Sequence, residues 1–376
     1  YGSSPDINAD NASGPTALDL RYKTVVVGSG GIVYIGNVKF DGRHMPDVMM
    51  YSMQGKPGVF PKYNKFDSPS SDGSPITALA SYRDKILQFK QNGLYVINVS
   101  NPNQYYAEAS FRDCGVFNPC QVFTTSFGVI FANKFGCYVY DGQKVMSLTS
   151  GKFDQDDWGL TEGTSHGGGS DASAVPCVGY DPRSQSIIVL KNIGDDADKD
   201  SNVNAYQTWV YNMATQSWSE GNDMITNEDG DRHTNFIITS SGYLSILRDN
   251  SATLFNYKQS NNSQTVTYIT KDIDFGMPSQ TKKIFKVYIT YKGDANSLTG
   301  TYGVNGDTSP TEAMTNSETS DATLENADVT DHNVATFTLN SHPADVKSIM
   351  FKFTGACGTD FEINDISILY RLRPIK

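Results

Sequence analysis

The sequence of 376 residues has no long apolar run and no extended helical pattern. A membrane-spanning helix needs roughly 18 to 20 consecutive apolar residues, and no stretch of the chain approaches that length. No segment with the charge and hydropathy pattern of a secretory signal opens the sequence. We therefore expect neither a membrane span nor a predominantly helical fold.

Cysteine is scarce, and no two cysteines stand at the spacing of a CxxC pair. The five are Cys114, Cys120, Cys137, Cys177 and Cys357. An odd number at wide spacing argues against a disulfide framework and against a zinc site. Several lie in apolar, strand-like segments, so we expect buried thiols. Such thiols fit assembly in a reducing compartment such as a bacterial cytoplasm.

The chain also lacks an excess of basic charge. Its 41 acidic and 30 basic residues give a formal net charge of −11. Tight or sequence-reading binding to nucleic acid normally needs a basic surface, because neutralised phosphates supply most of the affinity. An acidic wall is compatible with DNA passing nearby without adhering. The common role of such a charge, however, is solubility.

Motifs that carry chemistry are missing as well. The chain has no GxxxxGK[ST] phosphate loop, no GxSxG elbow and no HExxH pair. Its glycine-rich stretch at 28–31 leads into another strand-like run and therefore predicts a β-turn. The histidines are scattered singly, at His44, His166, His233, His332 and His342. We predict no catalytic residue, no cofactor and no enzymatic activity.

Glycine and aromatic residues are abundant, with 33 Gly, 21 Tyr and 19 Phe. This composition suits short strands joined by tight turns. Turn-forming pairs recur at Asp41-Gly42, Asp72-Gly73, Asn92-Gly93, Asp141-Gly142 and Asp229-Gly230. The segments that we expect to pair are 32–38 with 48–52, 85–90 with 94–99, 129–132 with 137–140, 187–190 with 208–211, and 235–239 with 243–247.

Some of these hairpins repeat at a regular distance. Gly93-Leu94-Tyr95 recurs as Gly136-Cys137-Tyr138, a separation close to the roughly 40–50 residues of a propeller blade. About five blade-like units of that size fit between residues 20 and 262. We therefore predict an irregular β-propeller over 20–264, preceded by an arm or partial strand at 1–19. A β-sandwich made from the same hairpins is the structural alternative.

Two insertions interrupt the hairpins. Residues 150–176 contain three consecutive glycines and few apolar residues, which is typical of a loop. Residues 193–204 are acidic, and Asp195, Asp196, Asp198 and Asp200 are weak candidates for a calcium site, because carboxylates supply hard oxygen ligands. The EF-hand spacing is not matched, and a solvated loop is the more common structure for such a run.

The pattern changes from about residue 265 onward, and we predict an antiparallel β-sandwich over 265–376. Residues 284–291 alternate, with Phe285, Val287, Ile289 and Tyr291 forming an apolar set that we expect to be buried. Further strands are expected at 336–339, 348–353 and 363–370. The polar stretch 305–333 between them predicts one long surface loop.

The order of these segments resembles that of virion proteins of the tail-nozzle and DNA-stabilisation type in short-tailed bacteriophages. The resemblance rests on segments 33–38, 46–47 and 52; 76–79, 87–90 and 94–97; 128–133 and 136–142; 271–279 and 282–283; and 363–367. It implies a propeller subunit in a homo-oligomeric ring, commonly six-fold, below the portal. Other tail or portal proteins would be its partners, and phage DNA would be retained by the ring and later ejected through it without sequence-specific binding.

The resemblance also implies a place in the virion tail, after assembly in the host bacterial cytoplasm. Two other classes compete with it. A glycan-binding or receptor-binding β-propeller of a virion or cell surface would present clustered exposed aromatic residues beside carboxylates. A propeller hydrolase would need two carboxylates facing each other across a sugar, and adjacency in the sequence, as at Asp156-Asp157, does not predict that geometry.

Overall fold

The computed structural model describes residues 21–40, 42–69, 73–102, 104–154, 158, 176–190, 208–221, 233–248, 254–257, 264–295, 297–325, 327, 330–340, 343–358 and 361–374. The chain divides into two compact units, residues 1–257 and 258–376. The predicted arm at 1–19, the acidic loop at 193–204 and most of the loop at 150–176 lie outside the described residues. No helix in the described ranges has the length and apolar character to cross a bilayer.

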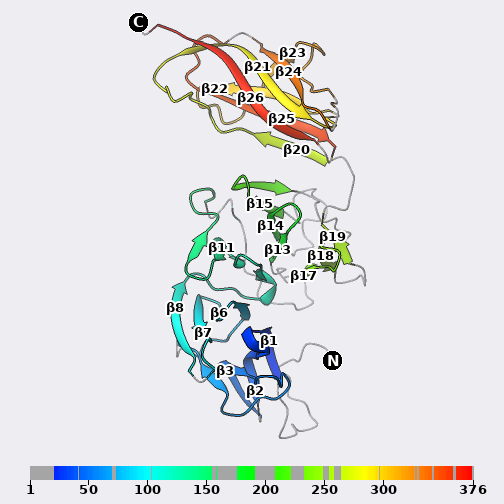
Figure 1. Ribbon diagram of the computed structural model, residues 1–376. Coiled ribbons are helices and arrows are strands. Elements are labelled where there is room, and N and C mark those ends of the chain that lie inside the picture. The colour runs from blue at the N-terminus through cyan, green and yellow to red at the C-terminus, as the bar shows by residue number, and fades with distance from the viewer. Residues whose placement is uncertain are drawn as a thin grey trace, which may run out of the picture. The chain divides into compact units, whose positions relative to one another are not determined.

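Five antiparallel sheets follow one another along the first unit (Figure 1). The first contains β1 (Arg21–Val27), β2 (Val33–Phe40), β3 (Arg43–Tyr51) and β4 (Lys65–Asp67). The second contains β5 (Ala78–Tyr82), β6 (Lys85–Lys90), β7 (Gly93–Asn98) and β8 (Tyr106–Arg112). The third contains β9 (Val122–Thr124), β10 (Val129–Asn133), β11 (Gly136–Tyr140) and β12 (Val145–Ser147).

The fourth sheet contains β13 (Cys177–Asp181), β14 (Ser186–Leu190), β15 (Thr208–Asn212) and β16 (Ser217–Gly221). The fifth contains β17 (His233–Ile238), β18 (Leu244–Arg248) and β19 (Leu254–Asn256). Two single 3₁₀ turns, η1 (Ser29–Gly31) and η2 (Pro119–Gln121), precede β2 and β9. Within every sheet, each strand pairs with its neighbours in sequence, which is the meander of a propeller blade.

The sheets are joined through their first strands. Strand β1 contacts β5, β5 contacts β9, β9 contacts β13, and β13 contacts β17. In a propeller the equivalent strands of successive blades lie side by side in this way around the axis. The first unit is therefore an irregular β-propeller, and its five described sheets agree with the predicted number of blade-like units.

Each predicted hairpin is confirmed as the central or leading pair of a sheet, namely β2–β3, β6–β7, β10–β11, β14–β15 and β17–β18. The predicted turn at 28–31 is confirmed by η1, where Gly30 and Gly31 take positive φ angles of 71°. Gly136 opens β11 at φ 152°, and a Cβ there would lie 2.2 Å from Thr149 Oγ1. This combination explains the glycine of the second Gly-x-Tyr copy, at Gly136.

Apolar residues fill the spaces between successive blades. Phe89 on β6 meets Phe131 on β10 edge to face, with ring centroids 5.1 Å apart, so the second blade packs on the third. Between the third and fourth blades lies an aromatic group of Phe153, Trp158, Trp209 and Trp218. Edge-to-face and offset ring pairs of this kind add to the stability gained from burial alone.

The second unit is a β-sandwich of seven antiparallel strands, in the order β20-β25-β22-β23-β24-β21-β26. The strands are β20 (Gln264–Ile269), β21 (Lys282–Lys292), β22 (Thr299–Val304), β23 (Glu312–Asn316), β24 (Asn333–Leu339), β25 (Ile349–Cys357) and β26 (Glu362–Leu372). Their inward side chains form one core, which includes Val287, Tyr302, Phe337, Phe351 and Phe353. The predicted all-β architecture of propeller followed by sandwich is thus confirmed.

Two details of the sandwich differ from the sequence-based expectation. Val287, Ile289 and Tyr291 are buried as predicted, but Ile284 is buried in place of Phe285. The pairing with β26 shifts register between Ile284 and Lys286, and such a bulge interrupts the strict alternation of faces. The predicted long loop at 305–333 is also wrong in part, because β23 lies within it and buries Met314.

Candidate binding surfaces

The described residues contain no obvious centre for metal or acid–base chemistry. No three His, Cys, Asp or Glu side chains among them lie close enough to hold a metal ion. The weak calcium candidates Asp195, Asp196, Asp198 and Asp200 lie outside the described residues. His44 is bound to its neighbour Asn37, with Nε2 2.8 Å from Oδ1. The prediction of a non-enzymatic protein therefore stays a prediction.

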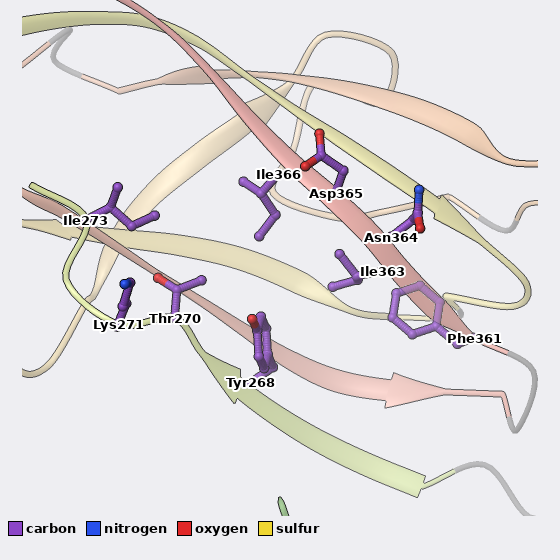
Figure 2. Close-up of a pocket in the computed structure, with 9 residues that line it drawn as sticks. All are labelled: Tyr268, Thr270, Lys271, Ile273, Phe361, Ile363, Asn364, Asp365 and Ile366. Carbon is purple, nitrogen blue, oxygen red and sulfur yellow. The ribbon is translucent and has the colours of Figure 1, made fainter. Parts of the chain in front are cut away.

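A groove in the sandwich is a concave surface formed by described residues (Figure 2). It has a volume of about 580 Å³. One wall comes from β20 and the segment after it, and the other from the start of β26. The lining residues are Tyr268, Thr270, Lys271, Ile273, Phe361, Ile363, Asn364, Asp365 and Ile366.

The floor of the groove is apolar and continuous with the core. Ile273, Phe361, Ile363 and Ile366 pack against the core side chains but are only partly buried. Tyr268 pairs with Phe353 across β20 and β25, and their rings stack with centroids 6.3 Å apart. The Tyr268 ring thus lies on the core face of its strand, yet 47% of the residue is exposed.

The rim of the groove is polar and carries charges of both signs. Lys271 lies on the β20 side, whereas Asn364 and Asp365 lie on β26 (Figure 2). Ser367 Oγ donates a hydrogen bond of 2.6 Å to the Asp365 carboxylate. Thr270 Oγ1 accepts a hydrogen bond of 3.0 Å from the Phe351 backbone N–H, which fixes the end of this wall. An elongated apolar floor with a mixed polar rim can bind a ligand through burial and a few directed contacts.

The pattern of apolar residues alone did not predict this groove. The segments 271–279 and 363–367 contribute to the family resemblance of the sequence, but that resemblance does not predict that they form one site. They meet only because β20 and β26 are the two ends of a seven-stranded sheet that wraps into a sandwich. The one local signal is an aromatic residue, Tyr268, on a short strand that is half polar.

A buried lysine lies beside the entry to the sandwich. Lys282 on β21 is fully buried, and its ammonium group donates hydrogen bonds to the backbone oxygens of Asp274, Met277 and Lys347 at 2.8, 2.7 and 2.7 Å. Burial lowers the pKa of Lys282, because desolvation disfavours the charged amine. The three carbonyl contacts tie the 274–277 turn to the sandwich, so this lysine has a structural role.

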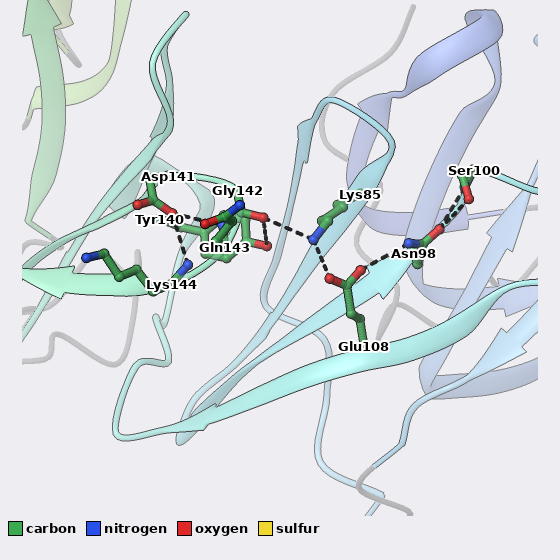
Figure 3. Close-up of polar contacts among 9 residues, drawn as sticks. All are labelled: Lys85, Asn98, Ser100, Glu108, Tyr140, Asp141, Gly142, Gln143 and Lys144. Carbon is green, nitrogen blue, oxygen red and sulfur yellow. Dashed lines mark hydrogen bonds and ion pairs between the residues drawn. The ribbon is translucent and has the colours of Figure 1, made fainter.

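In the propeller, a group of polar contacts links the second and third blades (Figure 3). Lys85 on β6 forms an ion pair with Glu108 on β8 and donates a 3.0 Å hydrogen bond to the Gly142 backbone oxygen. Burial alone would lower the pKa of Lys85, but the hydrogen bond that Lys85 donates to Glu108, together with the nearby Tyr140 and Glu108 groups, raises this pKa overall. The contact fixes one blade on the next and offers no free nucleophile or acid.

Asp141 orders the turn that receives Lys85. Its Oδ1 accepts hydrogen bonds from the backbone N–H groups of Gln143 and Lys144, at 2.8 and 2.9 Å. These two bonds favour the carboxylate and lower the pKa of Asp141. Tyr140 OH donates to the Gly142 oxygen at 3.0 Å, so that this oxygen receives two donors. The turn is therefore a rigid element of the blade interface.

Comparison with known proteins adds little. No protein-family model matches the chain, and no curated protein sequence matches it. Solved structures with a weak likeness include YCF48 bound to a D1 peptide, at 9% identity and a TM-score of 0.35, over 66% of this chain and 72% of that one. A protein from Lactobacillus plantarum, solved by a structural genomics consortium, aligns at 9% identity and a TM-score of 0.38 over 88% of each chain. Likenesses this weak carry no functional argument.

Proposed function

We propose that this chain is a non-enzymatic structural subunit of a bacteriophage tail, at the nozzle or head-to-tail channel. In this role it would form a homo-oligomeric ring, which is commonly six-fold in the family that the sequence resembles, and would help to retain and conduct DNA. The observation that carries the proposal is the order of the two units. A β-propeller is followed by an antiparallel sandwich, as the resemblance of the sequence implies.

Two properties of the described residues support a structural role. The blades bury apolar and aromatic side chains against one another, and contacts such as that of Lys85 with Gly142 fix successive blades. Well-packed interfaces of this kind favour a rigid wall over a mobile catalytic site. The net charge of −11 would keep DNA from adhering to such a wall.

The test is the mass of the full chain in solution, combined with electron microscopy of the same sample. We expect closed rings with an open axial channel, and we expect that free duplex DNA does not bind to the surface of those rings at physiological salt. A chain that stays monomeric at every concentration, and also when a portal protein is added, would contradict the proposal. Tight, salt-dependent binding of DNA would contradict the repulsive role of the acidic charge.

A second candidate is a glycan-binding or receptor-binding protein of a virion or cell surface. It is favoured by one observation, the presence of Tyr268 and Phe361 beside Asn364 and Asp365 in the groove. Aromatic faces combined with carboxylates and amides are suited to sugars. Saturable binding on a glycan array that is lost in Tyr268→Ala would favour this candidate over the structural role.

A further inference from the structure

The groove of the sandwich lies between two strands that each have an unpaired edge. Strand β20 pairs only with β25, and β26 pairs only with β21, among the described strands. The six pairings of the seven strands are all antiparallel. The first and last strands consequently run in the same direction, which Figure 2 also shows for β20 and β26. One additional strand in the opposite direction would be antiparallel to both.

The backbone groups at these two edges point outward. Thr270 N–H donates to the Phe351 oxygen, so alternate residues of β20 face β25, and Thr267 and Ile269 face away. On the other side, Arg373 N–H donates to the Thr281 oxygen. The same alternation along β26 turns the N–H and C=O groups of Ile366 and Ile368 away from β21. Unpaired edges of this kind are templates for an added strand.

The core beneath the groove is incompletely covered. Tyr268 on the core face of β20 is 47% exposed, and Ile363 and Ile366 on the core face of β26 are only partly buried. Core-facing side chains on the inner strands, such as Phe351 and Phe353, are fully buried. An extended chain laid between the edges could insert every second side chain onto this floor, while its backbone pairs with the strands.

We propose that this groove accepts an extended segment of another polypeptide as an eighth strand. The segment would carry aliphatic residues at alternate positions and a carboxylate opposite Lys271. In the described part of the chain Lys271 has no ion-pair partner, so an acidic residue of the ligand would complement it. Recognition by strand addition takes its affinity from main-chain hydrogen bonds and its specificity from alternate side chains.

A strand fits the groove better than a glycan does. The floor contains three isoleucines, at 273, 363 and 366, and aliphatic side chains bind the apolar side chains of a peptide. The outward-facing N–H and C=O groups of both edges, in turn, match a peptide backbone. Strand addition at this groove does not depend on the proposed tail function, since it can join the sandwich to another polypeptide in any protein assembly.

The experiment measures peptide binding to the full chain by fluorescence anisotropy. The probe is a labelled peptide of about ten residues, enough to span the groove at roughly 3.3 Å per residue, with Val at alternate positions, one Glu, and Ser or Thr elsewhere. The register of the Glu is varied across a small panel. The matched control peptide has the same sequence except for two Pro substitutions, which remove backbone donors.

We expect saturable binding by at least one register, and binding at least about tenfold weaker for the Pro peptide, because main-chain hydrogen bonds carry the affinity. Tyr268→Lys should weaken binding to a similar degree, whereas the control Tyr63→Lys, at a residue that is 83% exposed in the propeller, should not. Hydrogen exchange should slow at the amides of Thr267, Ile269, Ile366 and Ile368 in the bound state.

Three outcomes would overturn the inference. One is the absence of saturable binding by every peptide in the panel. Another is equal binding of the Val and Pro peptides with no slowing of exchange at either edge. The third is that an oligosaccharide binds the groove and displaces the peptide without protecting the edge amides. Because Tyr268 is half exposed, we expect the Tyr268→Lys variant to fold, and circular dichroism checks this. The ring assay above is independent, so failure of one proposal is distinguishable from failure of the other.

Discussion

At the scale of single residues, two buried glutamines of the propeller have opposite environments. Gln121 is fully buried, and its amide donates to the Ala132 oxygen at 2.9 Å and accepts from the N–H groups of Phe117 and Asn118. Gln88 on β6 is also fully buried, but neither atom of its amide has a hydrogen-bond partner within the described part of the chain. A buried polar group without a partner costs stability.

The same substitution at Gln88 and at Gln121 should have opposite effects on stability. Gln88→Met should raise the free energy of unfolding by about 1 kcal/mol, since it removes an unpaired amide and keeps the volume. Gln121→Met should lower it by about 2 kcal/mol, because three backbone groups lose their partner. Urea denaturation of both variants measures the difference. If Gln88→Met destabilises the protein as much as Gln121→Met does, the Gln88 amide is satisfied, for example by an internal water.

At the scale of elements, the turn between β11 and β12 depends on one carboxylate. Asp141 holds this turn by accepting hydrogen bonds from two backbone N–H groups. A backbone oxygen of the same turn accepts a hydrogen bond from Lys85 of the neighbouring blade. The two hydrogen bonds lower the pKa of Asp141 from its ordinary value of 3.8. The stabilisation is therefore fully present above pH 4 and is lost as the pH falls through the lower pKa of the folded state.

Asp141→Ala should accordingly lower the stability of the propeller by about 0.5–1 kcal/mol at neutral pH, a modest value because the carboxylate is largely solvated. The difference from the natural protein should shrink as the pH falls below about 4. Thermal unfolding followed at a series of pH values tests this, with Asp67→Ala on β4 as the control. A difference that stays constant across the series would show that the charge of Asp141 plays no part.

At the scale of the whole molecule, each of the two units has its own hydrophobic core. We therefore expect two calorimetric transitions for the full chain. Lys282→Met removes the three hydrogen bonds that the ammonium group donates to backbone oxygens and should lower the stability of the sandwich alone by about 2 kcal/mol. Lys286→Met, at an exposed position of the same strand, is the control. A single transition that shifts as a whole in Lys282→Met would show that the units unfold together.

The extent to which sequence predicted this molecule also varies with scale. Local hairpins were predictable, because turn pairs such as Asn92-Gly93 and the apolar runs beside them act over a few residues. Strand β8 was not, since most of its side chains are exposed and it lacks an apolar run. The bulge at Phe285 and the burial of Met314 on β23 depend on partners distant in sequence. The groove depends on the order of all seven strands, which no local pattern encodes.

The five cysteines have a practical consequence for following motion in this protein. All are buried thiols, as predicted, and burial raises the pKa values of Cys114, Cys137 and Cys357. A thiol reagent can modify such groups only when the surrounding strands open, so the rate of labelling measures how often the local structure opens. Four of these cysteines lie in the propeller and one, Cys357 on β25, lies in the sandwich. The order in which they are labelled would tell which unit opens first, without any engineered probe.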